Sequence, residues 1–206
     1  MAILTAYNPT KMALLELKRR HKQAKRGHKL LKDKQEGLMK AFMAIIRNAQ
    51  ALRKEVEEKL GDIFESFLFA SASEVHPEFI EAAFLVPAMQ VKLTTVTKNV
   101  MSVKLADMTA EMKGDPIAYG FYQTPAELDI ALIKLRDAFP LLVKLAEVEK
   151  KAERMAEELE KTRRRVNALE HITLPNVQDT IKYIGQILGE SARMQVVIAM
   201  IVKAKE

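Results

Sequence analysis

Apolar residues recur in steps of three and four positions along the first third of the chain. Two tracks of seven-residue spacing run through a segment from Thr10 to about Ala70 that contains no proline. One track holds Leu17, Ala24, Leu31, Leu38, Ile45 and Leu52, and the other holds His21, His28, Gln35, Phe42, Ala49, Val56 and Ile63. This spacing is the pattern of a coiled-coil seam, so it predicts a long helix within residues 1–70. Asn8-Pro9-Thr10 provides a signal for its start.

A second seam of the same kind lies near the other end of the chain. Its positions are Leu141, Leu145, Val148, Ala152, Met155, Leu159, Thr162, Val166 and Leu169. Because both seams belong to one chain, the simplest way to cover both apolar stripes is an antiparallel helical hairpin. We predict the returning helix over residues 125–206, beginning at about Pro125. Because Pro175 lies inside it, we also predict a kink or short break near Leu174.

Between the two seams the pattern changes from helical to β. Val91–Thr97 and Val100–Leu105 are rich in β-branched residues and flank a polar pair, Lys98 and Asn99. We predict a β-hairpin at about residues 89–108 with this pair at its tight turn.

The remainder of the middle region, residues 71–124, has no helical period, and residues 107–125 are predicted to form a loop. The predicted fold class is dominated by α-helix. It is a long antiparallel two-helix coiled coil with a small β-hairpin insertion, in one elongated domain.

The composition and motifs of the chain exclude several kinds of functional site. The 206 residues include no Cys, which excludes disulfides, thiolate metal sites and Cys nucleophiles. The glycines do not form a phosphate-binding P-loop, and the motifs of dinucleotide sites, zinc proteases and serine hydrolases are missing. We therefore expect no catalytic site and no cofactor of the chain's own.

Hydropathy favours a cytoplasmic chain that does not insert directly into a membrane. No stretch of about 18 residues is free of charge, and the residues after Met1 lack the basic start and apolar core of a secretory signal.

The histidines offer one alternative reading of the seam. His21 and His28 are seven residues apart, and His171 would lie near them in an antiparallel pair. A metal site is conceivable there, but neither Cys nor a nearby carboxylate completes a ligand set. We interpret the histidines as polar seam residues and expect no metal.

Positive charge is concentrated in one part of each predicted helix. Residues 11–34 hold ten Lys or Arg and two acidic residues, a local charge of +8 against +6 for the whole chain. In a hairpin whose paired residue numbers add up to roughly 195–200, a register inferred from the arm lengths, this cluster faces a second one on the return helix. We name the two together the basic collar: Lys25, Arg26, Lys29, Lys32, Lys34, Arg163, Arg164 and Arg165.

A basic collar is compatible with a solvated face, a nucleic-acid footprint or a protein contact. Charge runs on helices usually face water. Nucleic acid is disfavoured because both clusters lack aromatic side chains for base stacking. A protein contact also explains why the outer part of the seam is polar, with His21, His28 and Gln35, where another protein would surround the coiled coil.

Several motifs resemble the D subunit of the V-type and archaeal-type rotary ATPases. They are Asn8-Pro9-Thr10-Lys11-Met12, the run from Arg26 to Lys34, the run from Glu160 to Glu170, and Lys98-Asn99 with Met101–Lys104. They lie at both ends and in the middle of the chain, in the family's order, so the resemblance covers most of the sequence.

The resemblance implies a noncatalytic central shaft that carries torque between an ATP-handling hexamer and an ion-translocating membrane ring. Its implied partners are the catalytic and noncatalytic nucleotide-binding subunits, the small F subunit of the stalk and a stalk-base subunit. From its position along the coiled coil, the basic collar would lie near the mouth of the hexamer. The hairpin, with Lys98, Asn99, Met101 and Val103, would meet a partner and is associated in the family with stimulated ATP hydrolysis.

The resemblance also implies a cytoplasmic location, with peripheral attachment to the membrane through the ATPase complex. Without the resemblance, the residues support only a basic coiled-coil scaffold or a nucleic-acid-binding protein. We keep this as the alternative function.

Overall fold

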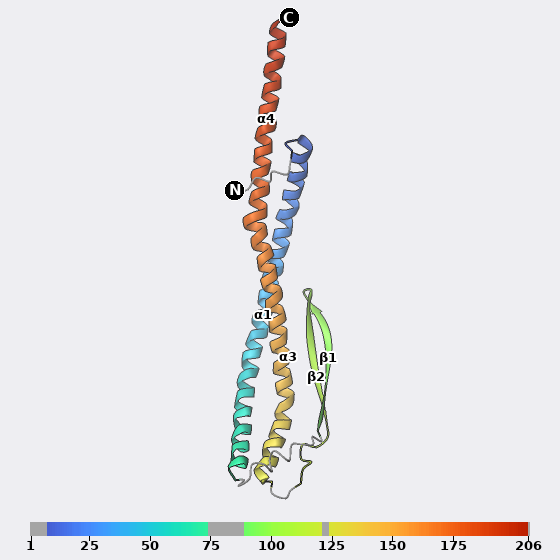
Figure 1. The fold of residues 1–206 in the computed structure, drawn as a ribbon, viewed down its shortest axis with the longest axis vertical. Helices are drawn as coiled ribbons and strands as arrows, with labels where there is room; N and C mark the ends of the chain where they lie inside the picture. Colours follow the sequence, from blue (N-terminus) through green and yellow to red (C-terminus); the bar gives the residue numbers. More distant parts are fainter. Residues whose placement is uncertain (1–7, 74–88, 121–123, 206) are drawn as a thin grey trace. The chain divides into compact units, whose positions relative to one another are not determined.

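The computed structural model describes residues 8–73, 89–120 and 124–205. Residues 1–7 of the predicted N-terminal segment and residues 74–88 of the predicted middle region lie outside the described residues. The elements follow in the order α1 (Lys11–Ser73), β1 (Gln90–Val100), β2 (Val103–Lys113), α3 (Ala126–Ala168), a π-helix (Leu169–Thr173) and α4 (Leu174–Lys205) (Figure 1). The described chain is mostly helical, with long helices packed antiparallel and one two-stranded hairpin. The predicted fold class is confirmed.

The chain divides into two compact units. Unit 1 comprises residues 1–37 and 159–206, and unit 2 comprises residues 38–158. Each contains a stretch of α1 packed against a stretch of the returning helix. None of the described helices contains a segment long and apolar enough to cross a membrane.

Unit 1 begins with a capped helix start. The backbone N–H of Ala13 donates to Thr10 Oγ1 at 3.1 Å, which satisfies one of the free donors of the first turn. Further along, Leu17 from α1 packs with Val177 and Ile184 from α4, and all three are buried. These residues lie on the predicted seam and its extension, where the apolar stripes of both helices face each other.

A π-helix interrupts the returning helix of unit 1. It spans Leu169–Thr173, and the N–H of Leu174 bonds to the carbonyl of Leu169, five residues earlier. Pro175 follows directly and has no N–H to offer to a carbonyl of the preceding turn. The irregularity predicted near Leu174 is this wider turn, and helix α4 continues beyond it to Lys205.

Unit 2 has the more apolar seam. From α1 it buries Leu38, Leu52, Val56, Ile63 and Ala70, and from α3 it buries Leu128, Ala131, Ala138, Val148 and Met155. Near the end of α1, Ala70 packs with Leu128, Tyr119 and Leu132.

Cross-helix contacts give the register of each unit. In unit 1, His28 meets Glu170, and in unit 2, Lys134 bonds to Ser66 at 2.8 Å. The residue numbers of these two pairs add up to 198 and 200. Both values lie at the upper end of the range predicted from the arm lengths.

The β-hairpin of unit 2 is longer than predicted, and its turn lies elsewhere. Strands β1 and β2 pair antiparallel from Gln90↔Lys113 to Val100↔Val103. The turn is made by Met101 and Ser102, whose φ angles of 52° and 71° are those of a hairpin turn that matches the strand twist.

The predicted tip at Lys98 and Asn99 was therefore wrong, because both residues lie within β1, opposite Leu105 and Lys104. The loop predicted from residue 107 was also wrong as far as Lys113. A turn at Lys98 would leave most of the second strand unpaired, whereas a turn at Met101 pairs eleven residues of each strand. The alternation of Met108, Ala110 and Met112 with polar residues is the sequence signal for this extension.

Candidate functional site

The basic collar lies within unit 1. Lys25, Arg26, Lys29 and Lys32 are exposed on α1, and Arg163, Arg164 and Arg165 are exposed on α3. Lys34 is half-buried and has an interaction partner.

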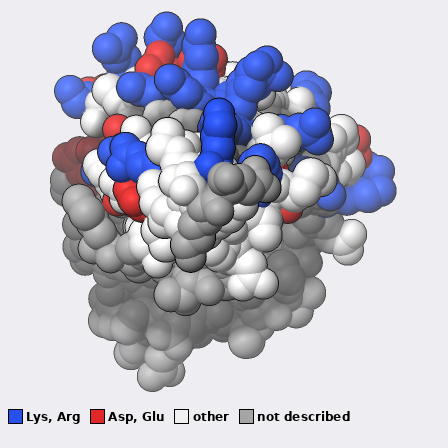
Figure 2. Space-filling view, turned by 90° about the horizontal axis from the view of Figure 1, so that it is seen from above, with Lys and Arg blue, Asp and Glu red and all other residues white. Residues whose placement is uncertain are grey.

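The register of unit 1 brings the two parts of the collar together. Counting along both helices from the His28–Glu170 pair brings Lys34 opposite Arg164. Lys25 and Arg26 lie more than two helical turns further along α1. Arg164 also pairs with Glu160 on its own helix. Figure 2, which looks onto the end at which α4 finishes, shows Lys and Arg side chains outnumbering acidic ones on the face in view.

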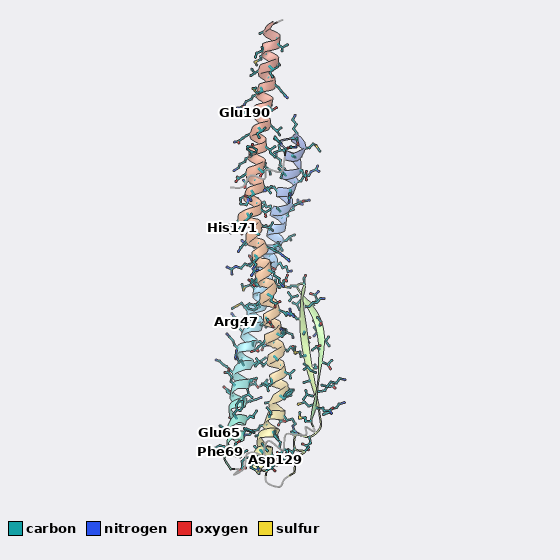
Figure 3. The ribbon with its side chains drawn as sticks, viewed as in Figure 1. Arg47, Glu65, Phe69, Asp129, His171 and Glu190 are labelled. Atoms are coloured by element: carbon teal, nitrogen blue, oxygen red, sulfur yellow. The ribbon has the colours of Figure 1, made fainter. Side chains whose placement is uncertain are left out.

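The seam beneath the collar is polar. His28 Nε2 lies 3.2 Å from Glu170 Oε2, and the two side chains are 19% and 49% exposed. His21 Nδ1 is buried and has no hydrogen-bond partner. His171 is exposed on the π-helix (Figure 3). Among the described residues, no group of three potential ligands comes together as a metal site requires.

The four hairpin residues selected from the sequence differ in accessibility. Lys98 and Asn99 are exposed on β1, and Met101 is exposed at the turn. Val103 is only 6% exposed, so it packs inside unit 2 instead of facing outward. Leu105, two residues further along the same face, is buried with it, as expected from the alternation of a strand.

Polar groups that the sequence pattern did not reveal join β2 to α3. Asp107 Oδ1 lies 2.5 Å from Lys151 Nζ, and Asp107 Oδ2 lies 2.5 Å from Lys98 Nζ. Glu147 pairs with Lys151 and accepts the backbone N–H of Met108 at 2.9 Å. We name Asp107, the Met108 N–H, Glu147 and Lys151 the hairpin clasp. Asp107 was missed because it fell in the predicted loop.

The charges of the clasp shift the pKa values of Asp107 and Lys151. Hydrogen bonds from Lys151 and then Lys98 lower the pKa of the Asp107 carboxyl from 3.8 to about 2. Burial disfavours the charge of Lys151, but its bonds to Asp107 and Glu147 outweigh this and raise its pKa. Asp107 and Lys151 therefore both remain charged at neutral pH.

The end of α4 exposes a run of apolar side chains. Every residue from 191 to 204 is exposed. The large apolar members are Met194, Val196, Val197, Ile198, Met200, Ile201 and Val202. At 100° per residue they spread over about 240° of the helix circumference, far more than the apolar stripe of a helix packed on one neighbour. The sequence signal for this surface is the uninterrupted apolar run itself.

A second exposed apolar surface lies at the end of unit 2 where α1 finishes. Phe64, Phe67, Leu68 and Phe69 are exposed, with Phe69 labelled in Figure 3 beside the last turns of α1. Ile130 and Ile133 on α3 are exposed as well. Exposed apolar patches of this kind mark protein contact sites.

Fold and surfaces together define a class of protein: a coiled-coil helical hairpin that exposes charged and apolar surfaces. The family model described as the ATP synthase D subunit matches residues 13–204. The V-type ATP synthase D subunit of Fusobacterium nucleatum is 49% identical over 199 residues, covering 95% of this chain and 94% of that protein.

Two further relatives have the same description. The Clostridium botulinum protein is 46% identical over 202 residues, covering 96% of this chain and 93% of its own length. The Thermoanaerobacter protein is 44% identical over 188 residues, covering 90% of each chain. The chain belongs to the family of ATP synthase D subunits, which confirms the resemblance found in the sequence.

Proposed function

We propose that this chain is the central shaft of a V-type rotary ATP synthase. It is a noncatalytic subunit that carries torque between a nucleotide-binding hexamer and an ion-translocating membrane ring. Family membership supports this proposal, as do the relatives described as V-type ATP synthase D subunits. The location that follows is the cytoplasmic side of a membrane, with attachment through the complex.

The observation that carries the proposal is the exposed end of α4. A helix with apolar side chains over about two thirds of its circumference is stable in water only if a partner covers most of that surface. A ring of subunits that encloses the helix meets this requirement, whereas a single groove covers only one side. The hexamer of catalytic and noncatalytic subunits is the partner proposed here.

The other surfaces fit the remaining partners. The basic collar, next along the coiled coil of unit 1, is proposed to lie near the mouth of the hexamer. The exposed aromatic residues Phe64, Phe67 and Phe69 are proposed to meet the stalk-base subunit. The hairpin and the helices beside it are proposed to hold the small F subunit and to influence ATP hydrolysis.

Torque follows from asymmetry. One helical hairpin inside a quasi-threefold ring cannot touch three catalytic interfaces equally, so each interface is biased toward a different conformation. Contacts shift an equilibrium only by their difference between the two states, and the coupling is reciprocal. A site that closes on ATP therefore pushes the shaft, and a driven shaft changes the affinity of the sites.

A charged collar suits a surface that must move past its neighbours. Exposed ion pairs contribute only about 0–1 kcal/mol each, so they can be exchanged from one subunit to the next at each step. This explains a basic exterior around a polar seam in unit 1.

Affinity purification of the tagged chain from native membranes tests the proposal. We expect two homologous nucleotide-binding subunits and a small subunit, identified by mass spectrometry. The isolated chain should hydrolyse no ATP but be required for coupled turnover. Recovery of nucleic acid or of unrelated proteins would contradict the proposal and favour a basic scaffold.

A further inference from the structure

The hairpin of unit 2 is held to its helix through one strand. All eleven residues of β1 are exposed, whereas β2 buries Val103 and Leu105 and half-buries residues 106–108 (Figure 1). Beyond Met108, every second residue of β2 is exposed. A two-stranded hairpin is only marginally stable by itself in water. The contacts between β2 and α3 therefore decide where the hairpin lies.

The clasp supplies the polar part of these contacts. Lys151 of α3 lies between two carboxylates, Asp107 from the hairpin and Glu147 from its own helix. Glu147 also accepts the N–H of Met108, a group on the edge of β2 that faces away from β1. The side chains of Lys151 and Glu147 are 19% and 17% exposed, so water competes weakly with these bonds.

We propose that Glu147 and Lys151 are positioning residues that hold the hairpin against α3, and that the docked hairpin is the form that stimulates ATP hydrolysis. This inference rests on the proposed function. A contact transmits force and selects a conformation only if it is held in a defined geometry, and a hairpin released from α3 lacks that geometry.

The absence of native Cys permits a break-and-rescue experiment. The double variant Asp107→Cys/Lys151→Cys removes the clasp lysine and its hairpin partner, and a short bis-maleimide then joins the two thiols. In the full chain, we expect amide hydrogen exchange over residues 90–113 to rise at least tenfold in the double variant. Cross-linking should return it to the wild-type rate.

ATP hydrolysis by the reconstituted complex is the second readout. We expect the double variant to fall to the rate of a complex whose shaft lacks residues 90–113, and cross-linking to restore it. Lys150→Met is the matched control, because Lys150 is a neighbour on α3 whose partner among the described residues is Glu153 of its own helix. It should change neither exchange nor rate.

Two results would overturn the inference. Unchanged exchange in the double variant would mean that the clasp does not hold the hairpin. Faster exchange with a wild-type rate of hydrolysis would mean that the clasp is structural only. Failure of the proposed function looks different: the wild-type chain would not assemble with the hexamer, or deletion of residues 90–113 would leave the rate unchanged.

Discussion

The two units build the same kind of helix pair from different seams. Between Leu17 and Leu38, α1 has no fully buried residue, and its seam there includes His21, His28 and Gln35. From Leu38 to Ala70 the same helix buries five apolar side chains. Unit 2 is therefore a stably packed coiled coil. Unit 1 is less tightly packed in the stretch where basic side chains cover its outside, which suits the protein contacts that we propose for this region.

Truncation of the apolar seam should produce the largest effect. Ile63 is 6% exposed, so Ile63→Ala should lower the free energy of unfolding by about 2–5 kcal/mol, because a buried side chain is lost and a cavity remains. Chemical denaturation measures this change. Phe64→Ala is the control: its side chain is 61% exposed, and its effect should stay within about 0.5 kcal/mol. Equal losses of stability at both positions would contradict the assignment of Ile63 to the buried seam and of Phe64 to the exposed surface.

Replacement of a polar seam residue should act in the opposite direction. His21→Leu removes the buried Nδ1 atom that lacks a partner, and we expect the free energy of unfolding to rise by about 1 kcal/mol. The same denaturation experiment measures it. Lower stability in this variant would show that the His21 side chain stabilises the seam of unit 1. The two units would then not differ in how well their seams are packed.

Reversal of charge in the collar should change function more than stability. Arg163, Arg164 and Arg165 are exposed, so their joint replacement with Glu should alter the free energy of unfolding by less than about 1 kcal/mol. Binding to the hexamer and coupled turnover should fall. Replacement of the same three residues with Lys keeps the charge and serves as the control. Unchanged coupled activity in the Glu variant would contradict the proposal that the basic collar contacts the hexamer.

Changes of pH should leave the ion pair between Asp107 and Lys151 intact over a wide range of pH. Because the pKa of Asp107 is lowered to about 2, its contribution is complete above 3.8 and is lost as pH falls toward 2. The raised pKa of Lys151 places its own loss above 10.5. The chemical shift of the Asp107 side-chain carboxyl carbon should therefore stay constant from about pH 5 to 9. A transition inside that range would contradict the assigned network.

Prediction from the sequence was most accurate where structure is local and repetitive. Predicted seam positions from Leu17 to Ile63 and from Leu141 to Leu169 are all buried or half-buried. The predicted helix start at Pro125 lies one residue from the observed start at Ala126. Accuracy was lowest at the hairpin, where Lys98 and Asn99 were placed at the turn and Asp107 in a loop.

The candidate surfaces divide in the same way. The basic collar followed from residue counts and register, because charge on a helix can be read directly from the sequence. The hairpin clasp was missed, since Asp107 and Glu147 are forty residues apart and no short motif connects them. The exposed apolar end of α4 was visible as a run, but only the structure showed that no described segment of the chain covers it.

By itself, the sequence determined the two long helices, their antiparallel pairing and register, and the family. Seven-residue periodicity specifies an apolar helix face independently of the rest of the fold. Two such faces in one chain can bury each other by packing together. Only the tertiary structure decided the turn at Met101 and Ser102, the π-helix before Pro175 and the clasp. A strand has no hydrogen-bond partner of its own, so its register depends on the turn and on the strand with which it pairs. Its burial depends on the distant residues of α3 that lie against it.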